Sequence, residues 1–209
     1  MNDSQGTPRG GISRRAFLTG SGAAAAATAL AGQPLPAAAA DDVKSPAGGA
    51  VAVGPGPVQI ELTVNGAKMT TKVEPRVTLL DALRNYLDVT GSKRVCDRGT
   101  CGACTVILDG RPVYSCSMLA LEARGRKVTT AESLAGSQLD DVPAAFVNCD
   151  AQQCGFCTPG FVVAMRATLD KNPNATPAEV EDGVSGNICR CGTYEQMRQA
   201  IELLCRKGG

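Results

Sequence analysis

Alternation of apolar and polar side chains marks the first folded segment of the chain. Residues 58–64 read Val-Gln-Ile-Glu-Leu-Thr-Val, the pattern of a strand that is buried on one face. Asn65-Gly66 follows, and this dipeptide favours the tight turn of a hairpin. The pattern therefore predicts a second strand over residues 68–73, which Pro75 ends.

A short helix is predicted after the first hairpin. Thr78 is placed to cap it, with Asp81 three residues further on. The apolar face of this helix is expected to consist of Leu79, Leu80, Leu83, Tyr86 and Leu87.

Three more strands are predicted beyond the helix. The apolar run 105–108 and the segment 112–114 flank the turn Asp109-Gly110, and residues 127–130 form the last strand. The resulting order is β-β-α-loop-β-β-β. This order predicts a β-grasp, ferredoxin-like domain over residues 58–131.

From about residue 132 onward, apolar residues recur at helical spacing. One helix is expected over 141–147, and three more are expected to start at the capping residues Thr158, Thr176 and Thr193. The apolar stripes of the second and fourth helices consist of Phe161, Val162, Met165, Leu169, Met197, Ile201 and Leu204. The fold class is therefore predicted to be α+β, with a four-helix domain over residues 132–209.

Residues 1–40 have the pattern of an export signal. Ser13-Arg14-Arg15-Ala16-Phe17-Leu18 matches the twin-arginine motif, and a weakly hydrophobic run and an Ala-rich cleavage site precede Asp41. The apolar run is shorter than the ~20 residues of a membrane-spanning helix. We therefore expect a signal peptide, a periplasmic protein without a membrane span, and a flexible linker over residues 41–57.

Composition narrows the possible chemistry. The 209-residue chain has a net charge of +1 and no histidine, so nothing indicates a nucleic-acid partner or a histidine-containing metal site. No nucleophile–base pair and no phosphate-binding loop is present, and no catalytic residue is predicted. The ten cysteines must instead be explained by disulfides or by metal.

Four cysteines have the spacing C-x4-C-x2-C-x11-C: Cys96, Cys101, Cys104 and Cys116. This is the plant-type ferredoxin spacing of a [2Fe–2S] cluster that is held by four thiolates. Gly99 and Gly102 would let the backbone fold around the cluster and direct N–H groups at the sulfurs. A zinc site or a disulfide loop is the alternative, although structural zinc favours repeated C-x2–4-C pairs or pairs combined with histidine.

A second set lies in the helical half: Cys154, Cys157, Cys189 and Cys191. Its C-x-C pair is too cramped to close a disulfide on itself, but it can place two thiolates on neighbouring metal atoms. Both pairs precede a predicted helix N-terminus, whose partial positive charge, with that of Arg190, would stabilise an anionic cluster. Cys149 and Cys205 match neither set and are expected to be small buried hydrophobes, with a disulfide or a partner contact as the alternative.

Three motifs in this order resemble those of a known family: Cys101-Gly102-Ala103-Cys104-Thr105-Val106, Gln153-Cys154-Gly155-Phe156-Cys157-Thr158-Pro159-Gly160 and Gly186-Asn187-Ile188-Cys189-Arg190-Cys191-Gly192. Over residues 57–209 the chain resembles the small, two-[2Fe–2S] subunit of the xanthine oxidase family of molybdenum hydroxylases. With its export signal, it is most similar to the iron–sulfur subunits of periplasmic aldehyde oxidoreductases. Val95 departs from the family, which usually has glycine there; because valine tolerates positive φ poorly, an extended entry or a remodelled turn is expected.

The resemblance implies an electron relay without substrate chemistry of its own. A large partner subunit would hold a molybdenum pterin, which Gln153 and Cys191 would contact, and a further subunit would hold FAD. Single electrons would pass from the pterin through the helical-domain cluster to the ferredoxin-type cluster, and on to the flavin subunit or another acceptor. Aldehyde oxidation to a carboxylate is the implied reaction, with purine- or isoquinoline-type heteroaromatic substrates as the alternative.

Two other functions remain open at this point. A free-standing ferredoxin-like electron carrier would also use two clusters, but it would not need the pterin-facing motif of the second domain. A disulfide-stabilised secreted binding module would explain the cysteines, but the twin-arginine motif and the C-x-C spacing argue against it.

Overall fold

A computed structural model of the protein describes residues 53–136 and 138–207. The predicted signal peptide, residues 1–40, and most of the predicted linker lie outside these ranges. Ala52–Gly209 form one compact unit. Within the described ranges, no helix combines the length and the apolar character that crossing a bilayer requires.

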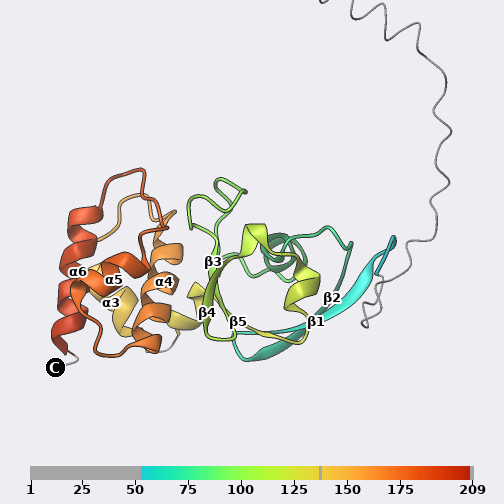
Figure 1. Ribbon diagram of the computed structural model, residues 1–209, viewed down its shortest axis with the longest axis horizontal. Coiled ribbons are helices and arrows are strands. Elements are labelled where there is room, and N and C mark those ends of the chain that lie inside the picture. Colours follow the sequence, from blue (N-terminus) through green and yellow to red (C-terminus); the bar gives the residue numbers. More distant parts are fainter. Residues whose placement is uncertain (1–52, 137, 208–209) are drawn as a thin grey trace, which may run out of the picture. The chain divides into compact units, whose positions relative to one another are not determined.

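Five strands form one mixed sheet in the order β2-β1-β5-β3-β4 (Figure 1). They are β1 (Val58–Val64), β2 (Ala67–Val73), β3 (Thr105–Leu108), β4 (Arg111–Tyr114) and β5 (Lys127–Thr129). The two predicted hairpins, β1–β2 and β3–β4, are both present and antiparallel. Strand β5 joins them, because it pairs parallel with β1 and antiparallel with β3.

The segment after β2 consists of a short α-helix, α2 (Leu79–Asp81), and a π-helical turn, η1 (Ala82–Tyr86). Thr78 caps α2 as predicted, because its side chain accepts a hydrogen bond from the backbone N–H of Asp81. The prediction for Tyr86 was wrong: this residue is 47% exposed. The wide turn, closed by the hydrogen bond from Leu87 N to Ala82 O, rotates Tyr86 away from the face that an α-helix would have buried.

The helices beyond the sheet are α3 (Asp141–Asn148), α4 (Thr158–Lys171), α5 (Pro177–Gly183) and α6 (Tyr194–Lys207). Three 3-10 turns lie before them: η2 (Ser115–Ser117), η3 (Ala120–Ala123) and η4 (Ala131–Leu134). Thr176 caps α5 in a capping box with Glu179, as expected. Thr158, by contrast, does not cap α4. Cys157 already has a helical backbone, so Thr158 is the first helical residue, and its hydroxyl is buried without a hydrogen-bond partner among the described residues.

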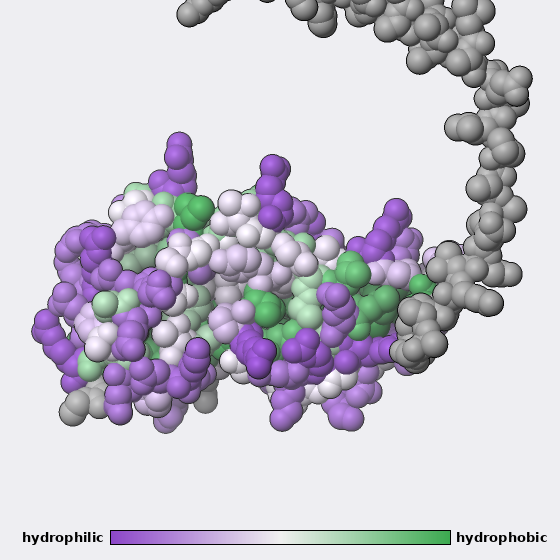
Figure 2. Space-filling view, in the orientation of Figure 1, coloured by the Kyte–Doolittle hydropathy of each residue, from purple (hydrophilic) through white to green (hydrophobic). Residues whose placement is uncertain are grey.

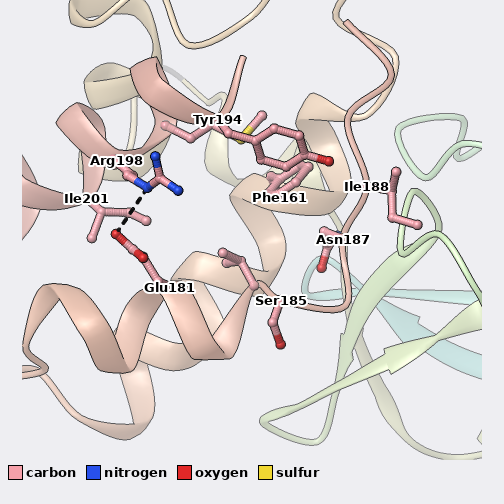
Figure 3. Close-up of a pocket in the computed structure, with 10 residues that line it drawn as sticks. Phe161, Glu181, Ser185, Asn187, Ile188, Tyr194, Arg198 and Ile201 are labelled. Atoms are coloured by element: carbon pink, nitrogen blue, oxygen red, sulfur yellow. Dashed lines mark ion pairs between the residues drawn. The ribbon is translucent and has the colours of Figure 1, made fainter. Parts of the chain in front are cut away.

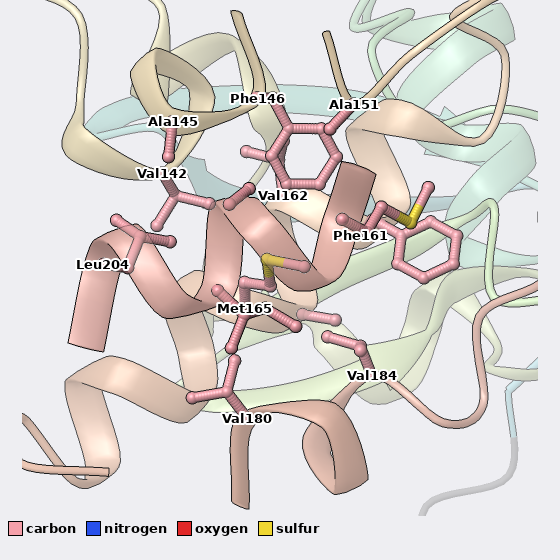
Figure 4. Close-up of a cluster of buried hydrophobic side chains, with 14 of the residues drawn as sticks. Val142, Ala145, Phe146, Ala151, Phe161, Val162, Met165, Val180, Val184 and Leu204 are labelled. Atoms are coloured by element: carbon pink, nitrogen blue, oxygen red, sulfur yellow. The ribbon is translucent and has the colours of Figure 1, made fainter. Parts of the chain in front are cut away.

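The two largest apolar cores lie within this compact unit. One includes Leu62 of β1 and Leu79 of α2. The other lies between the helices and includes Phe146, Phe161 and Met165 (Figure 4). Helix α4 also packs on β3, so the sheet and the helices share a continuous contact. The visible surface is mostly hydrophilic, with small separate hydrophobic patches (Figure 2).

The mixed sheet and the helices confirm the predicted α+β class. The two unassigned cysteines, Cys149 and Cys205, are free thiols that pack against the helical core while only partly buried. They were expected to be buried, and they pack against the core only at its partly exposed edge.

Candidate metal centres

The loop between η1 and β3 carries the first three cysteines of the first set. Gly99 and Gly102 have φ values of +68° and +69°, so both adopt the left-handed conformation for which glycine was expected. These turns aim backbone N–H groups at sulfur. Gly99 N donates to Cys116 Sγ at 3.2 Å, and Thr100 N donates to Cys96 Sγ at 3.4 Å. Such donors stabilise a thiolate, because a hydrogen bond to the charged form favours that form.

The β3–β4 hairpin brings the fourth cysteine to this loop. Its register pairs Thr105 with Tyr114, so Cys104 and Cys116 both lie just beyond the same end of the ladder, opposite the turn. The hydroxyl of Ser115 donates to the carbonyl oxygen of Cys104 at 2.7 Å and fixes this approach. Both Cys104 and Cys116 are buried.

The thiols of the first set form two pairs. Cys96 hydrogen-bonds with Cys101, and Cys104 with Cys116. Burial alone would raise the pKa of Cys96, but hydrogen bonds from neighbouring backbone N–H groups and from Cys101 lower it to about 6. Burial raises the pKa of Cys104 to about 11, and the adjacent Cys116 thiol adds to the rise. Each pair therefore brings two sulfurs close together.

Val95 lies at the entry to this loop and does not adopt a positive φ. The positive φ falls instead on Asp97, at +56°, and an aspartate tolerates this conformation better than a valine. Arg94 holds the turn in place, because its guanidinium pairs with Asp97 at 3.1 Å and with Asp81, the last residue of α2. Val95 itself is 55% exposed.

The second set lies where α4 and α6 begin. Cys157 is the N-terminal cap residue of α4, and its thiol hydrogen-bonds with that of Cys189. The sulfur of Cys189 lies 3.2 Å from Thr193 Oγ1, and its backbone N–H donates to the Tyr194 hydroxyl at 2.8 Å. Burial would raise the pKa of Cys189, but the Thr193 hydroxyl and nearby backbone N–H groups lower it to about 7. Burial, together with the thiols of Cys189 and Cys154, raises the pKa of Cys157 to about 12.

One side of the second set is open to solvent. Cys154 and Cys191 are exposed, and so is Gln153. Two apolar side chains beside them, Phe156 and Ile188, are 50% and 49% exposed. The structure thus places both predicted pterin contacts, Gln153 and Cys191, on the surface, where a group held by another chain can reach them.

Thr193 and Tyr194 were expected only to begin a helix, and their contacts with Cys189 were missed. The Tyr194 ring also packs edge-on against Phe161, with the ring centroids 6.4 Å apart. Both rings line a pocket of about 230 Å³, along which Glu181 and Arg198 form an ion pair at 3.7 Å (Figure 3). The available sequence signal was the presence of two hydroxyl side chains within five positions of a predicted ligand.

The donor chemistry of both sets fits a two-iron cluster. All ten cysteines are free thiols. Across residues 53–136 and 138–207, no three Cys, Asp or Glu side chains converge on a position for a single metal ion. Pairs of thiols are what a [2Fe–2S] cluster requires, because each of its irons takes two protein ligands. The N–H groups aimed at Cys96 and Cys116, and the hydroxyl beside Cys189, are donors suited to an anionic cluster.

Comparison with known protein families finds two matches. A 2Fe-2S iron-sulfur cluster binding domain matches residues 62–135, and a [2Fe-2S] binding domain matches residues 130–202. The first match contains all four cysteines of the first set, and the second contains all four of the second set. Each set is therefore similar to a known cluster-binding domain.

The individual relatives are named as subunits of enzymes. The chain is 43% identical to the nicotine 6-hydroxylase small subunit of Paenarthrobacter nicotinovorans, over 69% of this chain and 87% of that protein. It is 39% identical to the aldehyde oxidoreductase iron-sulfur-binding subunit PaoA of Escherichia coli (strain K12), over 68% of this chain and 69% of that protein.

Solved structures of oxidoreductases are also similar to this chain. Quinoline 2-oxidoreductase from Pseudomonas putida 86 is similar with a TM-score of 0.68 and 39% identity, over 73% of this chain and 96% of that chain. The aldehyde oxidoreductase from Desulfovibrio desulfuricans ATCC 27774 also gives a TM-score of 0.68, with 38% identity, over 71% of this chain. There the similarity covers only 17% of the longer chain.

Proposed function

This chain belongs to the family of small, two-[2Fe–2S] subunits of molybdenum hydroxylases, and on that premise we propose that it carries electrons away from a periplasmic molybdenum enzyme that oxidises aldehydes. Family membership makes it an iron–sulfur electron-transfer subunit of a multisubunit oxidoreductase. Each bound cluster would supply one-electron redox chemistry. The chain itself supplies the ligands, the surrounding hydrogen-bond donors and the spacing between the two centres.

The observation that carries this proposal is the pairing of Cys96 with Cys101, of Cys104 with Cys116 and of Cys157 with Cys189 inside one compact unit. The proposed ligands of the first cluster are Cys96, Cys101, Cys104 and Cys116. The proposed ligands of the second cluster are Cys154, Cys157, Cys189 and Cys191. No step of substrate oxidation is assigned to this chain.

The exposure of the second set supports a direction for electron transfer. Cys154 and Cys191 are exposed, whereas Cys104 and Cys116 are buried. A partner can therefore approach the second set most closely, and Gln153 and Cys191 are proposed to contact the molybdenum pterin of a large subunit. The first set would then deliver electrons to an FAD subunit or to another acceptor.

Aldehydes are proposed as substrates because this chain and PaoA are alike in the share of each protein that lies outside the matched region. Roughly a third of each of these two proteins lies outside the matched region, whereas the nicotine 6-hydroxylase small subunit is matched over 87% of its length. Heteroaromatic compounds are the second candidate, because nicotine, caffeine and quinoline appear in the names of relatives. Periplasmic location is proposed from the twin-arginine motif within residues 1–40.

The test is to purify the protein from the periplasm of its host through a C-terminal tag and to measure its metal content. We expect about four iron and four sulfide per chain, as two [2Fe–2S] clusters require, together with molybdenum and flavin in co-purifying subunits. The complex should then reduce an artificial electron acceptor with aromatic or aliphatic aldehydes. Turnover with purines or isoquinolines alone would instead show that the substrates are heteroaromatic compounds.

Two results would contradict the proposal. Iron and sulfide without molybdenum or partner subunits would identify a free-standing electron carrier. A colourless protein without iron would instead indicate that the cysteines bind zinc or form disulfides. Recovery of the complex only from the cytoplasm would contradict the proposed location alone.

A further inference from the structure

The two cysteine sets are joined by a seam that is centred on the buried side chain of Asn187. The seam residues of the helical half are Gly186, Asn187 and Ile188, which directly precede Cys189. Asn187 and Ile188 donate hydrogen bonds to the first cysteine loop at consecutive positions. Ile188 N donates to the carbonyl oxygen of Cys101 at 3.0 Å, and Asn187 Nδ2 donates to that of Gly102 at 2.9 Å.

Asn187 is the central side chain of this seam. It is only 6% exposed, and its amide also lies 3.4 Å from Thr105 Oγ1. The Gly102 carbonyl accepts from Asn187, from the Thr105 hydroxyl at 2.6 Å and from the Thr105 backbone N–H at 3.0 Å. Three donors thus fix the orientation of one peptide group that lies between two cysteines of the first set.

Glycines allow the two backbones to approach this closely. A Cβ on Gly160 would lie 2.4 Å from the Gly102 carbonyl oxygen, and a Cβ on Gly102 would lie 2.7 Å from the Asn187 amide. On the other side, the Tyr114 hydroxyl donates to the Gly186 carbonyl oxygen at 3.2 Å. The seam is therefore tightly packed, and its separation is set by these close backbone approaches together with the hydrogen bonds of the Asn187 and Tyr114 side chains.

We propose that Asn187 is a positioning residue that sets the separation and the electronic coupling of the two centres. This inference rests on the proposed function. Among the described residues Asn187 makes no hydrogen bond to a cysteine sulfur, yet it is two residues from Cys189 and hydrogen-bonds the residue after Cys101. A shift of its amide therefore moves the backbone of one set relative to the other while both sets of ligands stay complete.

The step that this geometry serves is a transfer of one electron within the chain. One centre is oxidised and the other is reduced by a single electron, and no bond or proton is exchanged. The hydrogen bond from Ile188 N to Cys101 O links the residue before Cys189 directly to a cysteine of the first set. Asn187 holds this link at its observed length.

The test compares the purified complex with its Asn187→Asp variant, which keeps the side-chain shape but replaces the N–H donor with an acceptor. Asn174→Asp is the matched control, because Asn174 is exposed and introduces the same charge in the same domain. The measurements are iron content, the magnetic interaction of the two reduced centres by electron paramagnetic resonance, and the rate of electron exchange between them after flash reduction.

We expect Asn187→Asp to retain iron in both sites, while the magnetic splitting changes and the exchange rate falls severalfold. Asn174→Asp should behave as the wild type. An iron-loaded Asn187→Asp protein with unchanged splitting and rate would overturn the inference. If Asn187→Asp loses iron, the measurements are repeated on Asn187→Ala, which removes the donor without adding a charge. The same criteria then apply to Asn187→Ala. Iron loss in both variants would overturn the inference too, because Asn187 would then be needed for folding.

Failure of the inference is distinguishable from failure of the proposed function. A wild-type complex without two centres would overturn both. Two normal centres whose interaction is insensitive to Asn187 would overturn only the positioning role.

Discussion

The backbone N–H of Ile188 donates a hydrogen bond to the carbonyl oxygen of Cys101 at 3.0 Å. This contact joins two motifs that lie far apart in the sequence, and each motif contains proposed ligands of a different cluster. The two centres consequently share a structural support. Changes at the seam should affect both, and changes at individual ligands should affect one.

Gly160→Ala should destabilise the protein even though alanine favours a helix more than glycine does. The new Cβ would lie 2.4 Å from the Gly102 carbonyl oxygen and 3.0 Å from Ala103 Cα, and neither backbone atom can move alone. We expect a loss of about 1–3 kcal/mol, the usual range for overpacking. Thermal unfolding of the iron-loaded protein measures it. Gly136→Ala is the control, because its Cβ would meet nothing within 4 Å. Equal melting temperatures for the two variants would contradict the close packing.

Cys116→Ser should remove the first cluster and leave the second. Cys116 follows β4 and contacts Cys104, so its loss breaks one thiol pair of one set only. We expect about half of the iron and sulfide to be lost, with one of two sets of reduced-cluster signals remaining. Cys149→Ser, which alters a cysteine outside both sets, should keep all of the iron. Full iron content in Cys116→Ser would contradict the ligand assignment.

Thr193→Val should lower the reduction potential of the second cluster. The Thr193 hydroxyl lies 3.2 Å from Cys189 Sγ, and a hydrogen bond to sulfur stabilises the more negative, reduced state. A hydrogen bond contributes about 1 kcal/mol, which corresponds to about 40 mV for a one-electron couple. Redox titration followed by electron paramagnetic resonance measures the shift. Thr193→Ser should restore the potential, and equal potentials for Val and Ser would exclude a role for the hydroxyl.

Arg190→Gln should also lower the potential of the second cluster only, because it removes a positive charge between Cys189 and Cys191. Arg190 is exposed, so salt should weaken the effect. Redox titrations at low and high ionic strength test both statements. Arg124→Gln removes an exposed charge from the sheet half and serves as the control. A shift of the first cluster by Arg190→Gln would count against this local effect.

Local sequence patterns were sufficient to predict most elements. The alternation in β1, the Asn65-Gly66 turn and the Asp109-Gly110 turn each act over a few residues, so their strands occur within one or two residues of the predicted bounds. The capping box at Thr176 is equally local. The four cysteines of the first set were predicted from their spacing, but their contacts in two pairs, Cys96 with Cys101 and Cys104 with Cys116, were not.

The errors arise where tertiary context outweighs a local preference. Thr158 is followed by proline, as helix N-cap residues often are, but Cys157 already has a helical backbone. Helix α4 therefore starts one residue earlier than predicted. Tyr86 fits an α-helical stripe, but a π-helical turn exposes it. The contact of Asn187 with Gly102 spans 85 positions, and no periodicity in the sequence reports it.

The long span of this contact has a consequence for how the protein matures. The first cysteine loop is synthesised well before Asn187 and Ile188, so a nascent chain that ends within the sheet half lacks the donors for the Cys101 and Gly102 carbonyls. These two hydrogen bonds can therefore form only after residue 188 has been synthesised. Part of the support of the first cysteine loop thus comes from residues that the ribosome adds more than 80 positions later.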